Sequence, residues 1–311
     1  MGPTAAGKTA LALEIAKHYP VEIISVDSAL VYRGMDIGTA KPDAETLAKY
    51  PHHLVDILDP TESYSVGQFR EDALRLMADI TARGKIPLLV GGTMLYFKAL
   101  EQGLADLPSA DPIIRAQLEA EIDQYGLAHL HDRLTKVDPV SAARIHVNDP
   151  QRLQRALEVY EITGHSLTEL TKETEKSLAY RVIKIIVSPF DRSVLHQRIA
   201  ERYQDMINNN FIDETKALFD RPDCHPDLPS FRAVGYRQAW MYLSGEYDQQ
   251  TMMEKAIIAT RQMAKRQLTW LRAQHDGVWF DSGDGLPTEQ VMNFLESQCS
   301  ELMSSLEKTK I

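Results

Sequence analysis

The chain has 311 residues, of which 44% are hydrophobic and 25% are charged, values typical of a globular protein with a sizeable buried core. Its formal net charge of −10 at pH 7 counts against a surface that binds polyanions everywhere, although local charge matters more than the sum. Two distant cysteines, Cys224 and Cys299, argue against a disulfide scaffold and a zinc site. No apolar run approaches the ~18 residues of a membrane span, so we expect a cytoplasmic protein with no membrane partner.

The first feature along the chain is a complete match to the phosphate-binding loop G-x-x-x-x-G-K-[ST]. Gly7 permits the curled backbone whose N–H groups point at one phosphate, and Lys8 places a cation on its outer oxygens. The Thr9 hydroxyl suits Mg²⁺, and the helical pattern that follows adds the positive end of a helix. The candidate diphosphate- or nucleotide-binding residues are Gly2, Pro3, Thr4, Ala5, Ala6, Gly7, Lys8 and Thr9.

A loop of this kind normally follows a strand, and the sequence has none before Gly2. A central parallel strand is not dispensable, because its neighbours would lose their backbone hydrogen-bond partners. We therefore expect that the natural chain starts upstream of Met1. The mass of the native protein tests this expectation.

The next segments alternate between strand-like and helix-like patterns. Apolar runs typical of strands occupy residues 21–27, 52–60 and 85–93, and residues 65–84 have helical apolar spacing. This alternation predicts a parallel sheet with helices on both faces. Asp27 ends the first run, so it should lie at the carboxyl edge that lines the ligand crevice of such sheets. A helix N-cap is the alternative for this residue, since Asp-Ser is a good capping pair.

The pattern changes at about residue 110 into consecutive helices separated by Asp-Pro pairs. The next β-rich run is at 180–189, which is typical of a strand returning to the sheet, and helices follow to the end. We therefore predict a phosphate-loop NTPase-like α/β core formed by residues 1–115 and 179–311. A helical insertion should occupy residues 116–178.

The loop alone does not name a reaction. A guanine-specificity motif N-K-x-D is absent from the sequence, which counts against a GTPase and against an RNA-binding nucleotide switch. An ATP-dependent small-molecule kinase with an arginine-rich lid is an alternative, as is an enzyme that uses the loop for the diphosphate of another donor. His129 and His131 have no third ligand at a suitable spacing, so we interpret them as helix residues.

Five longer stretches distinguish between these classes, at residues 24–42, 88–96, 148–164, 231–238 and 260–272. They include V-D-S-A-L, L-L-V-G-G-T, N-D-P-Q-R-L-Q-R, R-A-V-G-Y-R and K-R-Q-L-T-W-L-R. Together, and in this order, they resemble the bacterial tRNA dimethylallyltransferases over essentially the whole chain. A transferase that prenylates free adenine nucleotides is the nearest rival, but it would not need the stretches at 151–155 and 265–272.

The resemblance implies a reaction and its partners. Dimethylallyl diphosphate would donate its dimethylallyl group to N6 of the adenosine 3′-adjacent to the anticodon in tRNA, and diphosphate would leave. The loop would then hold the leaving diphosphate and not necessarily ATP. The implied cofactor is Mg²⁺, bound through Thr9, and the implied macromolecular partner is the anticodon stem-loop of tRNA. We expect a monomer.

The resemblance also implies residue roles. Asp27 would be the base that takes the proton of the adenine amine, while Lys8, Thr9 and Arg237 would stabilise the leaving diphosphate. Because the target base must leave its stack, Trp270 and Tyr236 are candidates to stack on bases, with the protein core as the alternative. The implied tRNA-binding residues are Asp27, Ser28, Ala29, Leu30, Thr93, Arg115, Gln151, Arg152, Leu153, Gln154, Arg155, Arg232, Ala233, Val234, Gly235, Tyr236, Arg237, Lys265, Arg266, Gln267, Leu268, Thr269, Trp270, Leu271 and Arg272.

Overall fold

The computed structural model describes residues 1–105, 107–172 and 178–308, with side chains up to residue 298. The chain divides into two compact units, one formed by Met1–Phe97 with Tyr180–Ile311 and the other by Lys98–Ala179. The second unit begins well before residue 116, where the sequence suggested a boundary. Its first long helix includes residues 112–115 and packs on a later helix of the same unit.

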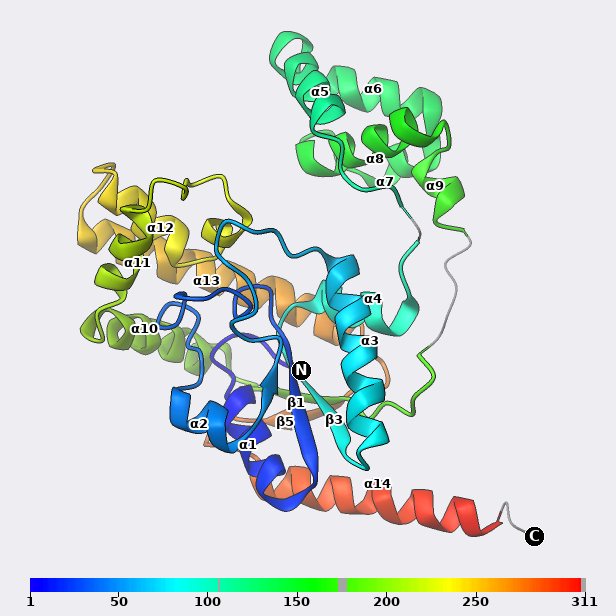
Figure 1. Cartoon of the computed structure of the whole chain (residues 1–311), viewed down its shortest axis with the longest axis vertical. Helices are drawn as coiled ribbons and strands as arrows, with labels where there is room; N and C mark the ends of the chain where they lie inside the picture. Colours follow the sequence, from blue (N-terminus) through cyan, green and yellow to red (C-terminus); the bar gives the residue numbers. More distant parts are fainter. Residues whose placement is uncertain (106, 173–177, 309–311) are drawn as a thin grey trace. The chain divides into compact units, whose positions relative to one another are not determined.

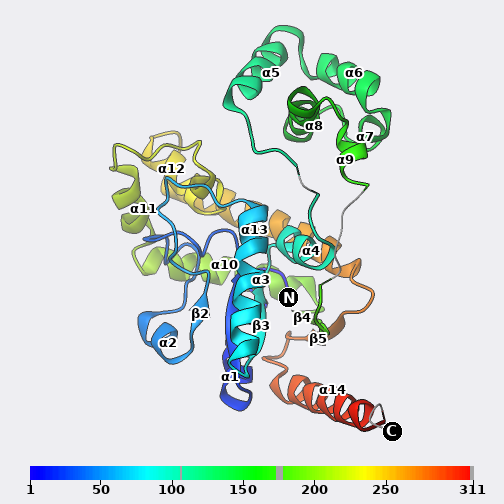
Figure 2. The same cartoon turned by 45° about the vertical axis from the view of Figure 1, so that its right-hand side comes forward.

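The first unit is built on parallel strands (Figure 1). Strands β1 (Val21–Val26), β2 (His52–His53) and β3 (Ile86–Gly91) form a three-stranded sheet in the order β2-β1-β3. Strands β4 (Ile185–Ser188) and β5 (Val278–Asp281) form a second parallel pair (Figure 2). Five of the six residues of β1 are buried, as expected for a parallel strand covered on both faces.

The backbone of Met1 lies against β4. The Met1 ammonium group donates to the Ile185 carbonyl oxygen at 2.8 Å, and the Met1 carbonyl accepts from the Val187 amide at 3.0 Å. This alternation on either side of one residue is the pattern of a neighbouring parallel strand. The strand expected upstream of Met1 stays a prediction.

Helices α1 (Lys8–His18) and α3 (Val66–Ala82) pack on the strands and each buries one apolar face, whereas the short helix α2 (Ala44–Lys49) buries no residue. Helix α1 places Leu11 and Ile15 in a cluster with Val187 and Phe280 of the second strand pair. Helix α3 begins at a capping box in which Ser65 and Gln68 exchange hydrogen bonds. The remaining helices around the strands are α4 (Met94–Gln102) and α14 (Thr288–Lys308).

Two strand expectations differ from the structure. The run at 52–60 forms only the two-residue strand β2, because Leu54 and Asp56 adopt left-handed φ angles of 62° and 55° that end the extended backbone. Strand β5 was not expected, since the sequence pattern indicated only helices after β4. Its four residues become a strand by pairing with β4, from Ile185 opposite Val278 onward.

Four helices form a layer of their own: α10 (Arg192–Asn208), α11 (Phe211–Phe219), α12 (Tyr236–Leu243) and α13 (Gln249–Arg272), with a short 3₁₀ helix at Pro229–Arg232. Helix α13 packs on α10 and α12, and α11 packs on α12. Their interior is aromatic: Phe211, Phe231 and Tyr236 are at most 1% exposed. Cys224 is buried with a free thiol, and the Cys299 side chain lies outside the described residues.

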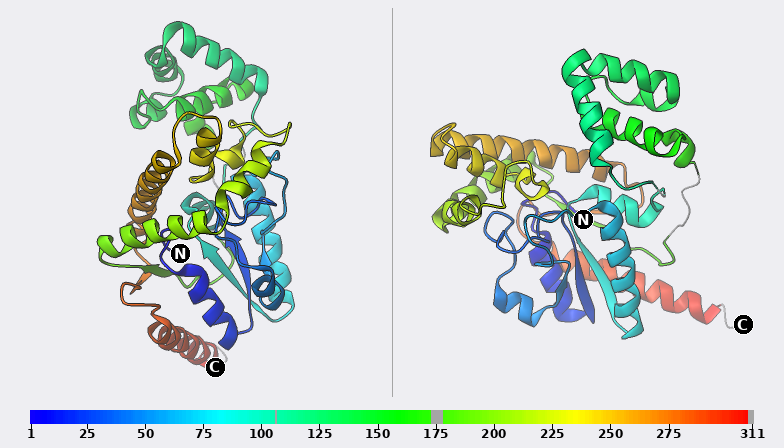
Figure 3. Two further views of the ribbon diagram at one scale, coloured as in Figure 1. Left: turned by 90° about the vertical axis from the view of Figure 1, so that its left-hand side faces the viewer. Right: turned by 45° about the horizontal axis from the view of Figure 1, so that its top comes forward.

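The second unit is a bundle of α5 (Pro112–Tyr125), α6 (Leu127–Val137), α7 (Pro139–Arg144), α8 (Pro150–Thr163) and α9 (Leu167–Leu170), drawn in green in Figure 3. Each Asp-Pro pair starts a helix. Asp111, Asp138 and Asp149 accept backbone N–H groups of the first turn, and the proline that follows needs no such donor there. Residues 173–177 of the expected insertion lie outside the described part of the chain.

Candidate active site

The phosphate loop has the expected backbone. Gly7 caps α1 with a φ of 87°, and Ala5 is also left-handed at 60°, so the loop curls tightly before the helix begins at Lys8. The ammonium of Lys8 donates to the Pro3 carbonyl at 2.6 Å, and Thr9 is exposed at the first turn. This arrangement leaves the N–H groups at the start of α1 with no partner within the helix, which is the geometry that binds an anion.

Ser282, the residue directly after β5, forms a hydrogen bond to this loop. The buried Ser282 hydroxyl donates to the Ala6 carbonyl at 3.0 Å, and Arg198 of α10 donates to the Ser282 carbonyl at 2.6 Å. Sequence reasoning missed both residues, because it did not expect β5.

The carboxyl ends of β1 and β3 meet beside the loop. The Thr93 amide donates to the Val26 carbonyl at 3.1 Å, and the Ser28 amide donates to the Thr93 hydroxyl at 3.1 Å. Gly91 is required at this approach, since a Cβ there would lie 2.0 Å from the Val26 oxygen. Asp27 Oδ1 accepts from the Ala29 amide at 2.9 Å. No helix starts at Asp27 in the described chain, so its capping contact is a turn and the N-cap alternative does not apply.

Three charged groups influence one another at this edge. Burial lowers the pKa of Lys8 to about 8, with Asp27 opposing that change and Arg202 reinforcing it. Burial also lowers the pKa of Arg202, which Asp27 partly offsets. The Arg202 side chain comes from α10 and donates to the Thr39 carbonyl at 3.1 Å. Asp27 therefore acts electrostatically on two cations, Lys8 and Arg202. Sequence reasoning missed Arg202, because nothing in R-I-A-E-R-Y distinguishes it from a surface arginine.

Gln267 of α13 connects two parts of the site. Its Oε1 accepts from the Thr4 amide of the loop at 2.9 Å, and its Nε2 donates to the Gly92 carbonyl after β3 at 2.8 Å. The resemblance implied a tRNA contact for this residue. In the structure both ends of its amide are engaged by the protein, so Gln267 positions the loop against the turn that carries Thr93.

Arg237 occupies a different environment from Arg202. It is exposed on α12, where it opposes the rise that burial causes in the pKa of Tyr247. The electrostatic influence on the pKa of Lys8 comes from Asp27 and Arg202. A role for Arg237 on the diphosphate stays a prediction.

Two of the predicted tRNA-binding arginines share a buried carboxylate in the helical unit. Glu158 is 0% exposed and accepts from Arg115 Nε at 2.7 Å, Arg155 Nη1 at 2.7 Å and the Asp111 amide at 2.9 Å. Burial favours the neutral acid, but these donors outweigh it and lower the pKa of Glu158. Arg152, by contrast, has a side chain that is 72% exposed.

Several residues in the predicted tRNA-binding stretches have buried side chains: Leu153, Tyr236, Leu268 and Leu271. Tyr236 is 0% exposed and packs edge-on against Phe211, so its place is the core and its ring does not stack on a base. The exposed residues of the last stretch all lie on α13: Lys265, Arg266, Thr269, Trp270 and Arg272.

Protein groups suited to a metal are few. Within the described residues, no cluster of three or more histidine, cysteine or acidic side chains could hold a metal ion. His131 Nε2 lies 3.1 Å from the Ala142 carbonyl and 3.2 Å from the Ile145 carbonyl, in agreement with its interpretation as a helix residue. None of the helices in the described ranges is long and apolar enough to cross a membrane.

The fold and the site define a phosphate-loop α/β protein in which the carboxylate that follows β1, Asp27, acts electrostatically on Lys8 of the loop and on Arg202. A family model described as IPP transferase matches residues 30–274. The chain belongs to the IPP transferase family.

Solved structures of related proteins agree with this. The chain is 40% identical to a tRNA isopentenylpyrophosphate transferase from Bacillus halodurans, with a TM-score of 0.71 over 98% of this chain and 97% of that one. It is 32% identical to a tRNA delta(2)-isopentenylpyrophosphate transferase from Staphylococcus epidermidis, with a TM-score of 0.69 over 97% of each chain. A eukaryotic dimethylallyltransferase acting on tRNA is 26% identical, with a TM-score of 0.80 over 96% of this chain and 78% of that one. The expected family and fold class are confirmed.

Proposed function

We propose that this protein transfers a dimethylallyl group from dimethylallyl diphosphate to N6 of the adenosine 3′-adjacent to the anticodon in tRNA, with release of diphosphate. The observation that carries the proposal is that Gln267 joins the phosphate loop with Lys8 to the carboxyl ends of β1 and β3, where Asp27 follows β1 and acts electrostatically on Lys8 and Arg202. This arrangement combines cations for a leaving diphosphate with a base for a proton. Membership of the IPP transferase family supports it.

The donor side of the reaction needs charge neutralisation above all. An allylic C–O bond breaks readily when the negative charge of the departing diphosphate is stabilised. The loop amides, Lys8 and Arg202 supply fixed positive charge where that charge develops. Mg²⁺ prefers oxygen ligands, and the exposed Thr9 hydroxyl fits it together with phosphate oxygens of the donor. When bound, the ion would add further electrostatic stabilisation of the diphosphate.

The acceptor side needs a base, because the lone pair of the adenine amine is delocalised into the ring. Asp27 Oδ1 is held by the Ala29 amide, which leaves Oδ2 for the amine. As the N–C bond forms and the C–O bond breaks, the amine proton passes to this carboxylate. The diphosphate leaves with the electron pair of the C–O bond.

The tRNA would be bound through its anticodon stem-loop by a monomer in the cytoplasm. The exposed cations Lys265, Arg266 and Arg272 on α13 are suited to phosphate contacts. We extend the proposal to Arg152 on the helical unit, whose side chain is largely exposed. Arg115 and Arg155 are less available for phosphate contacts, because their guanidinium groups already donate hydrogen bonds to Glu158.

A labelling experiment tests the proposed function. The protein is mixed with Mg²⁺ and unmodified tRNA that carries adenosine 3′ of the anticodon, with radiolabelled dimethylallyl diphosphate in one tube and γ-labelled ATP in another. A third tube replaces the tRNA with AMP. Isoprenoid label in the tRNA is the expected result. Transfer from ATP alone would establish a kinase, and label in AMP but not in tRNA would establish a free-nucleotide prenyltransferase.

A further inference from the structure

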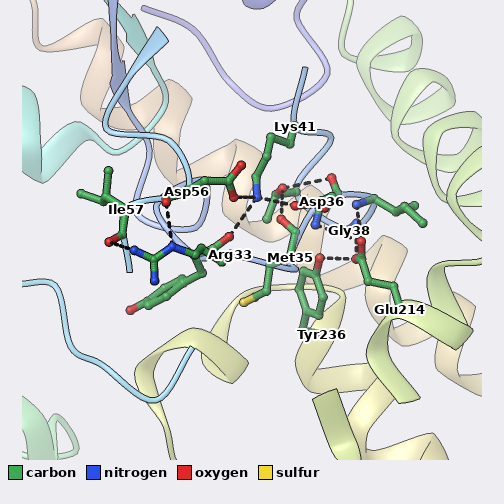
Figure 4. Close-up of polar contacts among 12 residues, drawn as sticks. Arg33, Met35, Asp36, Gly38, Lys41, Asp56, Ile57, Glu214 and Tyr236 are labelled. Carbon is green, nitrogen blue, oxygen red and sulfur yellow. Dashed lines mark hydrogen bonds and ion pairs between the residues drawn. The ribbon is translucent and has the colours of Figure 1, made fainter. Parts of the chain in front are cut away.

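One carboxylate outside the group just described accepts four hydrogen bonds (Figure 4). Glu214 lies on α11, and its Oε2 accepts from the Asp36 amide at 2.9 Å and the Ile37 amide at 2.7 Å. Its Oε1 accepts from the Gly38 amide at 3.2 Å and from the Tyr236 hydroxyl. Three successive amides that converge on one anion form a concave binding site for negative charge.

Close packing against α11 and α12 restricts the position of the turn at 36–38. A Cβ on Gly38 would lie 2.3 Å from the Phe211 ring and 2.6 Å from the Tyr236 ring, so only glycine lets the turn approach α11 and α12 this closely. The Thr39 hydroxyl also donates to the Met35 carbonyl at 2.7 Å and closes the turn on itself. The contact between the turn and the Glu214 carboxylate is therefore maintained by packing as well as by hydrogen bonds.

The same segment is anchored at its far end by a lysine. The Lys41 side chain is 4% exposed and donates to the Tyr32 carbonyl at 2.9 Å. It also pairs with Asp36 and Asp56. Lys41 thus fixes the ends of the segment 32–41, while Glu214 fixes its middle.

The residue directly after the turn connects this anchor to the reacting groups. The Thr39 carbonyl accepts from Arg202 at 3.1 Å, and Arg202 acts electrostatically on both Lys8 and Asp27. We propose that Glu214 is a positioning residue: by holding the turn 36–38 it places the Thr39 carbonyl, which in turn orients the Arg202 guanidinium toward the leaving diphosphate. This inference rests on the proposed function, because it assigns Arg202 a diphosphate to stabilise.

The substitution Glu214→Gln is the sharpest probe. A glutamine of the same shape has one acceptor oxygen where the carboxylate has two, so its NH₂ group must face N–H or O–H donors. The turn should then shift and misplace Arg202. We expect kcat to fall by about 10- to 100-fold, the size associated with a displacement of ~1 Å in a catalytic constellation. KM for either substrate should change less, because the charge on the diphosphate develops in the transition state.

The decisive measurement is a double-mutant cycle with Arg202→Ala. If Glu214 acts through Arg202, the additional substitution Glu214→Gln should cost nothing further in kcat once Arg202 is gone. If Glu214 only stabilises the fold, kcat will fall by the same factor in both backgrounds and the proposal is overturned. An unchanged kcat in Glu214→Gln alone would overturn it as well.

Two further variants keep the test informative. Tyr236→Phe removes one of the four donors and leaves the carboxylate, so it should lower kcat in the same direction but by a smaller factor, and it serves if Glu214→Gln does not fold. Glu254→Gln, an exposed position on α13, is the matched control and should leave kcat unchanged. Absence of activity in the wild-type protein would refute the proposed function itself, which is a different outcome.

Discussion

At the scale of single residues, the chemistry depends on how the protein environment changes ordinary side chains. Lys8 is a motif residue, yet its pKa near 8 comes from burial and from Arg202, which lies far away in the sequence. Asp27 is a common turn residue, yet it acts electrostatically on Lys8 and Arg202 and has one oxygen engaged by the Ala29 amide. Two predictions belong at this scale.

The first prediction concerns the pH dependence of kcat/KM, which should follow the ionisation of Lys8. Lys8 is protonated below about pH 8 and loses its charge as pH rises through that value, because burial disfavours the ammonium form. kcat/KM for dimethylallyl diphosphate should therefore decline above about pH 8, since this ratio reports ionisations of the free enzyme. Lys8→Arg keeps its charge and should not show that decline, whatever its absolute rate. A wild-type profile that stays flat from about pH 7 to 9 would contradict the assignment.

The second prediction concerns Asp27, the proposed base, and its contribution to turnover. Asp27→Asn keeps the shape of the side chain but cannot take a proton, so turnover should fall by ~10²- to 10⁴-fold, the usual contribution of a general base. The dissociation constant for tRNA should stay within a factor of about 3, because phosphate contacts supply most of the affinity. Asp43→Asn, which affects only the cap of α2, is the matched control. Equal decreases in turnover and in tRNA affinity would exclude Asp27 as the base.

At the scale of elements, local signals and charge clusters fix where strands and helices lie. Strand β1 enters the core with a charged residue, Glu22, whose side chain is 6% exposed. Its carboxylate accepts from Lys85 at 2.9 Å, His53 at 2.8 Å and Arg83 at 2.6 Å. Burial would raise the pKa of Glu22, but these three donors outweigh it and lower the pKa to about 2. The cluster therefore joins β1 to β2 and to the start of β3.

This cluster predicts a decrease of stability in acid. A carboxyl group whose pKa is depressed in the folded state stabilises the protein above its ordinary pKa of 4.5, and this contribution disappears as pH falls toward 2. Glu22→Gln should lower the free energy of unfolding by about 2–3 kcal/mol at pH ~7 and by about 1 kcal/mol at pH ~3, where part of the stabilisation remains because the folded-state pKa is lower still. Urea unfolding at both pH values measures this difference.

The control for this prediction is Glu14→Gln, which breaks an exposed pair with Lys17 on α1. Surface pairs of this kind contribute about 0–1 kcal/mol, so little change is expected at either pH. If Glu22→Gln behaves like Glu14→Gln, the buried cluster does not stabilise the strand.

At the scale of the whole molecule, the net charge is negative, whereas the charge of one surface helix is positive. The chain carries −10 overall, yet residues 255–272 contain five basic side chains and no acidic one. Helix α13 buries Leu268 and Leu271 within the first unit and leaves Lys265 and Arg266 exposed. A basic surface on an acidic protein can still attract a polyanion, because screening limits each interaction to about 10 Å at ~0.1 M salt.

We therefore expect the double substitution Lys265→Ala with Arg266→Ala to weaken tRNA binding. The slope of log affinity against log salt should become shallower by ~0.7–0.9 for each phosphate group that the variant no longer neutralises. KM for dimethylallyl diphosphate should not change. Lys17→Ala, at the far end of α1 from the loop, provides the control. Unchanged tRNA affinity at two salt concentrations would remove α13 from the interface.

How much of the site could be predicted depends on how local each interaction is. The loop could be recognised because all its chemistry lies within eight consecutive residues, and Asp27 because it directly ends an apolar strand. The helix starts at the Asp-Pro pairs could also be predicted from the sequence, because each capping aspartate bonds to amides two or three residues further on. The role of Arg202 could not be predicted, because its hydrogen bond to Thr39 spans 163 positions of the sequence.

The sequence by itself determined the phosphate loop, the helical stretch after residue 110 and the family, because these depend on short motifs and on apolar periodicity. Only the tertiary structure decided that Arg202 interacts electrostatically with Asp27, that Tyr236 belongs to the core and that Gln267 and Glu214 each form hydrogen bonds that join distant segments. It also decided that four residues after α13 become β5. Such features arise from pairing between segments far apart in the chain, and no local pattern encodes which distant partner a polar side chain will meet.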